Sequence, residues 1–149
     1  MALVYKTQNP IVLLGTKTSA GVATGIQLES TYQTTEVTTP IKSFPTGAYS
    51  KLTLDLIYGM GAAETTNSIE MKVEGSPDRI NWYRLPIDTT ATQSTITARE
   101  WTFVGTNGTT ANISIILDIA YKFMRVAFKE TGVSSAKGTV FCEATLSGY

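Results

Sequence analysis

The chain contains no histidine among its 149 residues. Histidine is the usual general base near neutral pH and the commonest protein ligand for metals. The residue most often found in acid–base catalytic sites and in metal sites is therefore missing. Catalytic arrangements of the Ser-His-Asp and Cys-His types are excluded. The single cysteine, Cys142, excludes an intramolecular disulfide and a Cys-x-x-Cys zinc site.

Charged residues are also scarce. They make up 16% of the chain, and 12 basic residues balance 12 acidic ones. Domains that bind nucleic acid usually carry a basic excess or a basic stripe, so we expect no nucleic-acid partner. A nearly neutral surface repels copies of itself only weakly, which favours crowding and assembly.

Long apolar runs are missing as well. No run approaches the roughly 20 residues that a membrane-spanning helix needs, so we expect no membrane partner. Residues 1–6 lack the basic start and apolar stretch of a signal peptide, so we expect the protein to be made in a cytoplasm. No long stretch shows the 3.6-residue period of an amphipathic helix.

The clearest positive signal is alternation of apolar and polar residues with period two. This pattern is typical of antiparallel strands that bury one face and wet the other. The alternating apolar positions are Leu52, Leu54, Leu56, Tyr58 and Met60; Ile69, Met71 and Val73; Ile113, Ile115 and Leu117; Met124, Val126 and Phe128; and Val140, Cys142, Ala144 and Leu146. Further strands are predicted at 11–14, 25–28, 37–41, 82–85 and 101–104. Short strands at this spacing indicate a sandwich or barrel, and we expect an all-β, antiparallel, jelly-roll-like β-sandwich.

Two glycine-containing segments are predicted to close hairpins. The segment 105–108 ends in Asn107-Gly108, a strong hairpin signal because both residues tolerate positive φ. It predicts that strand 101–104 pairs with the strand around Ile113. The segment 132–138 is predicted to join the last two strands in the same way.

Residues 1–50 are rich in Thr, Ser, Gly and Pro and show weaker periodicity than the rest. We expect segments 16–25 and 40–47 to be long loops, or else parts of an arm that orders only against a neighbouring molecule. The length suits a single β domain over 1–149, with the sandwich core in 51–149.

Carboxylates are the remaining candidates for chemistry. Asp55 could form a pair with Glu70 or Glu74 across neighbouring strands, as glycoside hydrolysis requires. The alternative, which we favour, is that these residues point into solvent and pair with Lys51 or Lys72, because exposed ion pairs are common.

Three other motifs have a structural interpretation that we favour over a functional one. Asp78 and Asn81 lie close together but belong to no Asp-x-Asp-x-Asp series, so they predict a turn rather than a calcium site. Cys142 is expected to be a buried apolar residue rather than a reactive thiol. The glycosylation sequons at Asn107 and Asn112 are expected to be chance matches. The sequence thus predicts no catalytic, cofactor-binding or metal-binding residue, and no cofactor.

Four aromatic residues are candidates for a sugar-binding platform: Trp82, Tyr83, Trp101 and Phe103. Trp82 and Tyr83 are adjacent, so on a strand they face opposite ways and only one of them can enter the core. Trp101 and Phe103 share a face. Packing in the core is the interpretation we favour for such a pair.

Two segments together resemble a known class of protein. The first, Val73–Leu85, carries Ser76-Pro77-Asp78 followed by Asn81-Trp82-Tyr83, and the second begins with Tyr121-Lys122-Phe123-Met124-Arg125-Val126. With the strand over 139–146, they resemble small β-sandwich virion proteins of tailed bacteriophages, among them capsid decoration proteins. The resemblance covers about residues 67–149.

The resemblance implies a non-enzymatic structural protein of the virion, made in the host cytoplasm. Its expected partners are the major capsid protein, which it would bind as a decoration or cement protein, or other virion proteins. A homo-oligomer is expected, with a trimer as the first guess, and residues 1–50 are expected to supply much of the contact. The alternative is a tail-associated or carbohydrate-binding module, which predicts an exposed aromatic ridge at Trp82 or Trp101.

Overall fold

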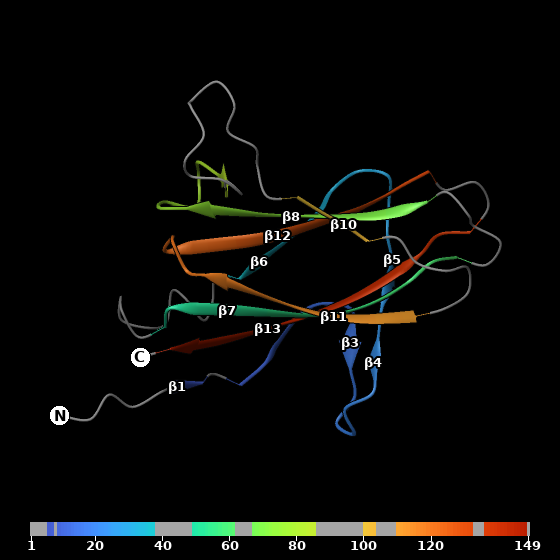
Figure 1. The fold of residues 1–149 in the computed structure, drawn as a ribbon, viewed down its shortest axis with the longest axis horizontal. Coiled ribbons are helices and arrows are strands. Elements are labelled where there is room, and N and C mark those ends of the chain that lie inside the picture. The colour runs from blue at the N-terminus through green and yellow to red at the C-terminus, as the bar shows by residue number, and fades with distance from the viewer. Residues whose placement is uncertain are drawn as a thin grey trace.

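The computed structural model describes residues 6–7, 9–37, 49–61, 67–85, 100–103, 110–132 and 136–148. These residues form strands and connecting segments, without a helix (Figure 1). The strands are β1 Lys6–Thr7, β2 Ile11–Leu14, β3 Thr16–Lys17, β4 Ala23–Thr24, β5 Ile26–Gln27, β6 Gln33–Val37, β7 Lys51–Gly59, β8 Ser68–Ser76, β9 Tyr83–Arg84, β10 Glu100–Phe103, β11 Thr110–Asp118, β12 Phe123–Thr131 and β13 Thr139–Gly148.

The long strands lie in two antiparallel sheets that face each other (Figure 1). In the first sheet β13, β7 and β11 lie side by side, and the short strands β1, β2 and β5 pair with the free edge of β13. In the second sheet the order is β6, β12, β8 and β10, and β9 pairs with β8. The predicted antiparallel β-sandwich is confirmed.

The connectivity of the two sheets is that of a jelly roll. From β5 to β8 the chain crosses between the sheets at every step; β10 stays beside β8, and β11, β12 and β13 alternate again. The first sheet therefore reads β5–β13–β7–β11 and the second β6–β12–β8–β10, which is the order that two interlocked Greek keys produce.

Both predicted hairpins are wrong. Strand β10 pairs with β8 in the second sheet, whereas β11 pairs with β7 in the first. Likewise β12 pairs with β8 and β6, whereas β13 pairs with β7. Each of these connections crosses from one sheet to the other. Residues 104–109 and 133–135 themselves lie outside the described residues.

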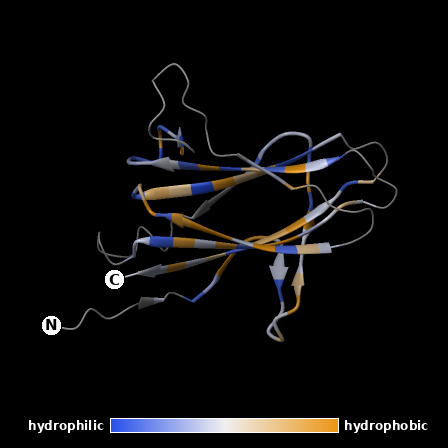
Figure 2. Ribbon diagram, in the orientation of Figure 1, coloured by the Kyte–Doolittle hydropathy of each residue, from blue (hydrophilic) through white to orange (hydrophobic). Residues whose placement is uncertain are grey.

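The predicted alternating residues form the core between the sheets. All but Tyr58 and Ile113 of those on β7, β8, β11, β12 and β13 are buried, and Met60, just after β7, is buried too. Figure 2 shows apolar segments recurring along the strands of both sheets. Full burial of one such side chain contributes about 1.5–3 kcal/mol, so this shared core is the main source of stability.

The polar face of β13 departs from the expected pattern. Glu143, which alternates with the apolar positions and was expected to be exposed, is buried, and so are Phe141 and Ser147 on the same face. The hairpin of β3 and β4 covers part of this face: a Cβ on Gly15 would lie 3.0 Å from the Phe141 ring. The period-two pattern of β13 alone does not predict that a segment more than a hundred residues earlier in the chain buries its outer face.

The expectation for the first 50 residues is corrected within residues 9–37. Segment 16–25, expected to be a loop or part of an arm, contains the β3–β4 hairpin, and 11–14 is a strand as predicted. The predicted strand 25–28 is confirmed as β5, over Ile26–Gln27. The strand predicted at 37–41 overlaps β6, Gln33–Val37, at Val37; residues 38–48, and with them the predicted segment 40–47, lie outside the described residues.

Candidate functional site

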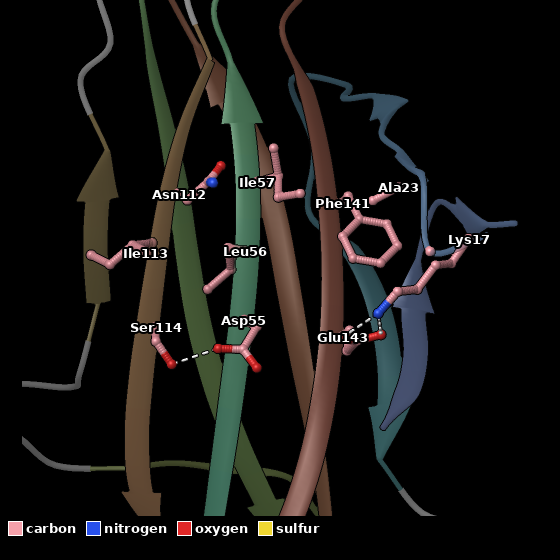
Figure 3. A pocket seen from close by; sticks show the side chains of 11 residues that line it. Lys17, Ala23, Asp55, Leu56, Ile57, Asn112, Ile113, Ser114, Phe141 and Glu143 are labelled. Carbon is pink, nitrogen blue, oxygen red and sulfur yellow. Dashed lines mark hydrogen bonds and ion pairs between the residues drawn. The ribbon is translucent and has the colours of Figure 1, made fainter. Parts of the chain in front are cut away.

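A groove lies on the outer face of the first sheet, where the β3–β4 hairpin stands beside β13 (Figure 3). Its volume is about 330 Å³. It is lined by Lys17, Gly21, Ala23, Asp55, Leu56, Ile57, Asn112, Ser114, Ile113, Phe141 and Glu143. Five strands (β3, β4, β7, β11 and β13) and the hairpin turn thus contribute, and the groove mixes carboxylates, an amide and a hydroxyl with apolar walls.

An ion pair fastens the hairpin at one side of this groove. The Lys17 ammonium donates to both carboxylate oxygens of Glu143, at 2.8 and 2.7 Å. Glu143 is mostly buried, whereas about a third of the Lys17 side chain is exposed. The contact is therefore partly screened by water, and it positions the hairpin more than it stabilises the fold.

Asp55 is the carboxylate that the fold brings next to Glu143. The two residues face each other on β7 and β13, so their Cβ atoms are about 5 Å apart. The Ser114 hydroxyl donates to Asp55 at 2.5 Å (Figure 3). Lys17 and Ser114 thus offset the repulsion between the two carboxylates, and the arrangement is that of a structural contact.

The predicted pairing of Asp55 with Glu70 or Glu74 is wrong. Asp55 lies in the first sheet and both glutamates lie on β8 in the second. The prediction assumes that the consecutive strands β7 and β8 are neighbours, but the chain crosses between sheets after β7.

The favoured alternative, exposed ion pairs of these carboxylates with Lys51 or Lys72, is confirmed only for the pairing of Glu74 with Lys72, and Glu74 is buried rather than exposed. Lys51 pairs with Asp118, at 2.5 Å, rather than with Asp55, while Lys72 pairs with Glu74 at 2.9 Å. Arg125 also donates to Glu74, at 2.6 Å. Burial opposes the charged form of Glu74, but the hydrogen bonds from Lys72 and Arg125 outweigh it and hold the pKa below its usual range.

Asp78 forms the predicted turn. Its Oδ1 accepts from the backbone N–H groups of Asn81 and Ile80, both at 2.8 Å, and from the Ser76 hydroxyl at 3.0 Å. These bonds, those to Asn81 first, lower the pKa of Asp78 well below its usual range. Arg79, at φ 66°, completes the tight turn. The carboxylate is thus occupied by its own loop.

Cys142 is buried on β13, as predicted. Burial, followed by the nearby carboxylates of Asp55 and Glu143, raises the pKa of its thiol to about 12. The thiol is therefore neutral at physiological pH and acts as a small apolar side chain.

The four candidate aromatics do not form a ridge. Phe103 is buried and lies 5.1 Å from the ring of Tyr58, while Trp101 packs partly buried against the core. The Arg125 guanidinium lies 4.3 Å from the Trp82 ring centroid. Tyr83 is 51% exposed. Core packing is confirmed for Trp101 and Phe103. Of the four aromatic residues, Tyr83 is the exposed one that a sugar could contact.

Sequence reasoning missed a cluster of aromatic and cationic side chains at one end of the second sheet. Tyr83 stacks on Tyr121 with 6.3 Å between centroids, and Lys122 and Arg79 lie 5.3 and 5.5 Å from the Phe123 ring. The two segments that carry the phage resemblance thus meet in space. Pairing of β8 with β12 brings them together, a contact that neither segment reveals alone.

Strand β11 forms an exposed edge of the first sheet. It pairs with β7 along all nine residues and with no other strand of the described part of the chain. Ile116 is 67% exposed and Ile113 39%. The exposed Asn112 of the second sequon also lies on this strand and lines the groove; Asn107 lies outside the described residues.

The described ranges contain no group of three or more His, Cys, Asp or Glu residues placed to hold a metal ion. None of their residues forms a helix long and apolar enough to cross a membrane.

Comparisons with known proteins find weak similarity to a solved structure. No family model matches the sequence, and no curated protein matches it. A chain of the structure described as "Bacillus endospore appendages form a novel family of disulfide-linked pili" aligns with 96% of this chain and 85% of its own length. The identity is 10% and the TM-score 0.37, too low to support a shared function.

Proposed function

We propose that this chain is a non-enzymatic structural protein of a bacteriophage virion, a capsid decoration protein that binds major capsid subunits. The observation that carries the proposal is the jelly-roll order of the two sheets, β5–β13–β7–β11 and β6–β12–β8–β10. Jelly rolls recur in viral capsid and lectin domains. Because a fold alone does not fix a function, the surface has to supply the rest of the argument.

The surface offers contacts suited to assembly. Three of the exposed apolar side chains, Val12, Val22 and Ile26, belong to the segment that covers and extends β13. Exposed apolar groups gathered in one region mark contact sites between proteins. We assign this side of the first sheet to the capsid contact, which keeps the expected role of the N-terminal region although that region is part of the sandwich.

A point substitution tests this assignment better than a deletion. Removing residues 1–20 would also remove β1, β2 and β3, so loss of binding would be confused with loss of folding. Val22→Asp places a charge on an exposed side chain of the hairpin turn. Ile80→Asp is the matched control, because Ile80 is also exposed but lies in the β8–β9 turn of the other sheet.

The measurement is co-sedimentation of the purified protein with phage capsids that lack it. We expect the wild type and Ile80→Asp to sediment with the capsids and Val22→Asp to stay in solution, with unchanged circular dichroism for all three. A wild type that stays in solution would contradict the decoration role. Binding by Val22→Asp equal to wild type would contradict the assigned surface.

A second candidate is a tail-associated or carbohydrate-binding module. The observation that favours it is the half-exposed ring of Tyr83, stacked on Tyr121 beside Trp82. An aromatic ring with one open face can pack against a sugar ring. A glycan array decides: binding by the wild type that Tyr83→Ala abolishes, with the fold intact, would favour this module over the capsid role.

A further inference from the structure

The edges of the two sheets differ in length and in protection. At the far edge of the first sheet, β2 and β5 are four and two residues long, and the pairing of β2 with β13 is broken by a register shift. Within the described residues, the edges of the second sheet, β6 and β10, have five and four residues. Short and bulged edges resist pairing with other chains. Strand β11, with nine residues in unbroken register, has neither protection.

The residues of β11 also favour pairing with another strand. The stretch Thr110–Leu117 carries no charge, no Pro and no Gly, and half of its residues are β-branched Thr or Ile. Natural edge strands usually carry Lys, Pro or an inward-pointing charge that prevents such pairing. The first charge is Asp118 at the end of the strand, and it is already bound to Lys51.

We propose that β11 is the contact at which a second copy of this chain adds to the first sheet, antiparallel about a two-fold axis through Ser114. Full overlap of Thr110–Asp118 with itself places each Ser114 opposite the other and Asn112 opposite Ile116. Each outward residue then meets an outward one, as a continuous sheet requires. Asp118 faces Thr110, so no like charges meet.

The same register also buries apolar side chains of β11 that are exposed in the single chain. Ile113 lies on the same face of β11 as the buried Ile115 and Leu117 but stays 39% exposed. In the pair it faces Ile115 of the second copy. The contact is self-complementary, as a two-fold interface must be.

We assign the edge to a second copy rather than to a strand of another protein. In the two-fold register, the outward residues of both copies meet and no like charges face each other. The pairing goes beyond the proposed attachment to a capsid and needs no capsid, so its test can fail while that proposal stands. A trimer, the first guess from the resemblance, would need a different surface.

Disulfide trapping tests the register. In this register position 114 is the one that faces its own counterpart, so Ser114→Cys is expected to cross-link two copies under mild oxidation. Cβ atoms of opposite residues lie about 5 Å apart, close enough for a disulfide with a small adjustment. The native Cys142 is buried and does not compete.

The matched controls separate pairing from random collision. Ser19→Cys has the same chemistry on the exposed hairpin turn, and Asn112→Cys lies on β11 but faces Ile116. We expect Ser114→Cys to cross-link at least about tenfold faster than either, because pairing holds the two thiols at a high effective concentration. Equal rates for the three variants would overturn the proposal.

Solution mass provides an independent readout. Light scattering of the wild type is expected to approach twice the chain mass of 16.1 kDa as concentration rises. Ile116→Lys, which charges the edge, is expected to shift the protein toward the monomer, whereas Ile80→Lys leaves it unchanged. A monomer at all concentrations, a trimer, or cross-linking at Ser114→Cys only when capsids are added would overturn the proposal.

Discussion

At the scale of single residues, Glu130 is the most deeply buried charged residue among those described, with 1% of its surface exposed. Its carboxylate accepts from the Asn67 amide at 2.6 Å and from the backbone N–H of Gly138 at 2.7 Å. Asn67 immediately precedes β8, Glu130 lies near the end of β12, and Gly138 immediately precedes β13. One buried group thus fixes three elements of both sheets.

Glu130→Ala is expected to lower the free energy of unfolding by about 1–3 kcal/mol, because it leaves the N–H of Gly138 and the Asn67 amide buried without an acceptor. Urea denaturation measures the change. Glu29→Ala, which removes an exposed ion pair with Lys137, is the control and should change stability by less than about 1 kcal/mol. Equal effects of the two substitutions would show that the buried network does not matter.

Because the Cys142 thiol is buried in the folded state, we expect the protein to lose stability at high pH. Burial raises its pKa from 9.0 to about 12, so the unfolded thiol ionises first and the folded state then holds more protons. The contribution is complete below pH 9 and falls by up to about 1.4 kcal/mol per pH unit between the two values. Denaturation of the wild type and Cys142→Ala from pH 8 to 11 checks this. A difference in stability that stays constant with pH would contradict it.

At the scale of elements, the β3–β4 hairpin depends on Gly15. Its φ is +89°, and a Cβ there would lie 2.4 Å from the carbonyl oxygen of Thr24. Both facts require glycine, since other residues rarely adopt this conformation. The turn holds the hairpin against Phe141 and so shapes the groove on the first sheet.

Gly15→Ala is expected to release the hairpin at a cost of about 1–3 kcal/mol through backbone strain and the clash with Thr24. Hydrogen exchange should become faster over residues 16–24 while the amides of β7 keep their protection. Ser19→Ala, in the exposed turn of the same hairpin, should leave exchange unchanged. Unchanged exchange in Gly15→Ala would contradict the role of this glycine.

The sequence predicted the strands that carry strong alternation, because each of β7, β8, β12 and β13 buries one face in the shared core. It failed where partners come from distant segments. The Asn107-Gly108 pair pointed to a hairpin by local chemistry, yet β10 and β11 belong to different sheets. A local turn motif predicts that the chain bends at that point. It does not predict whether the next strand joins the same sheet or the other one.

The candidate site shows the same limit. The turn at Asp78 and the burial of Cys142 follow from residue type and immediate neighbours, and both predictions were confirmed. The contact of Glu143 with Lys17 spans 126 positions, and its only signal in the sequence was a charge inside an apolar strand. The pairing of Asp55 failed because strand order decides it.

At the scale of the whole molecule, strands from both halves of the chain are needed to complete each sheet. β13 is the centre of the first sheet and pairs with β1, β2, β5 and β7. The core therefore closes only after the end of the chain has met its beginning, and the loops that must be closed are long.

This topology predicts slow folding. All-β domains dominated by distant pairings fold in milliseconds to seconds, and we expect a rate in that range. Stopped-flow refolding followed by fluorescence of Trp82 and Trp101 measures it. A refolding phase of microseconds that recovers the full signal would contradict the observed strand order.

Electron cryomicroscopy of virions that contain the chain, compared with virions from which its gene is deleted, tests the proposed function most directly. The account predicts additional density of the size of this β-sandwich on the outside of the capsid, with the β3–β4 side of the first sheet toward the major capsid protein. Virions without any such density, or density confined to the tail, would contradict it.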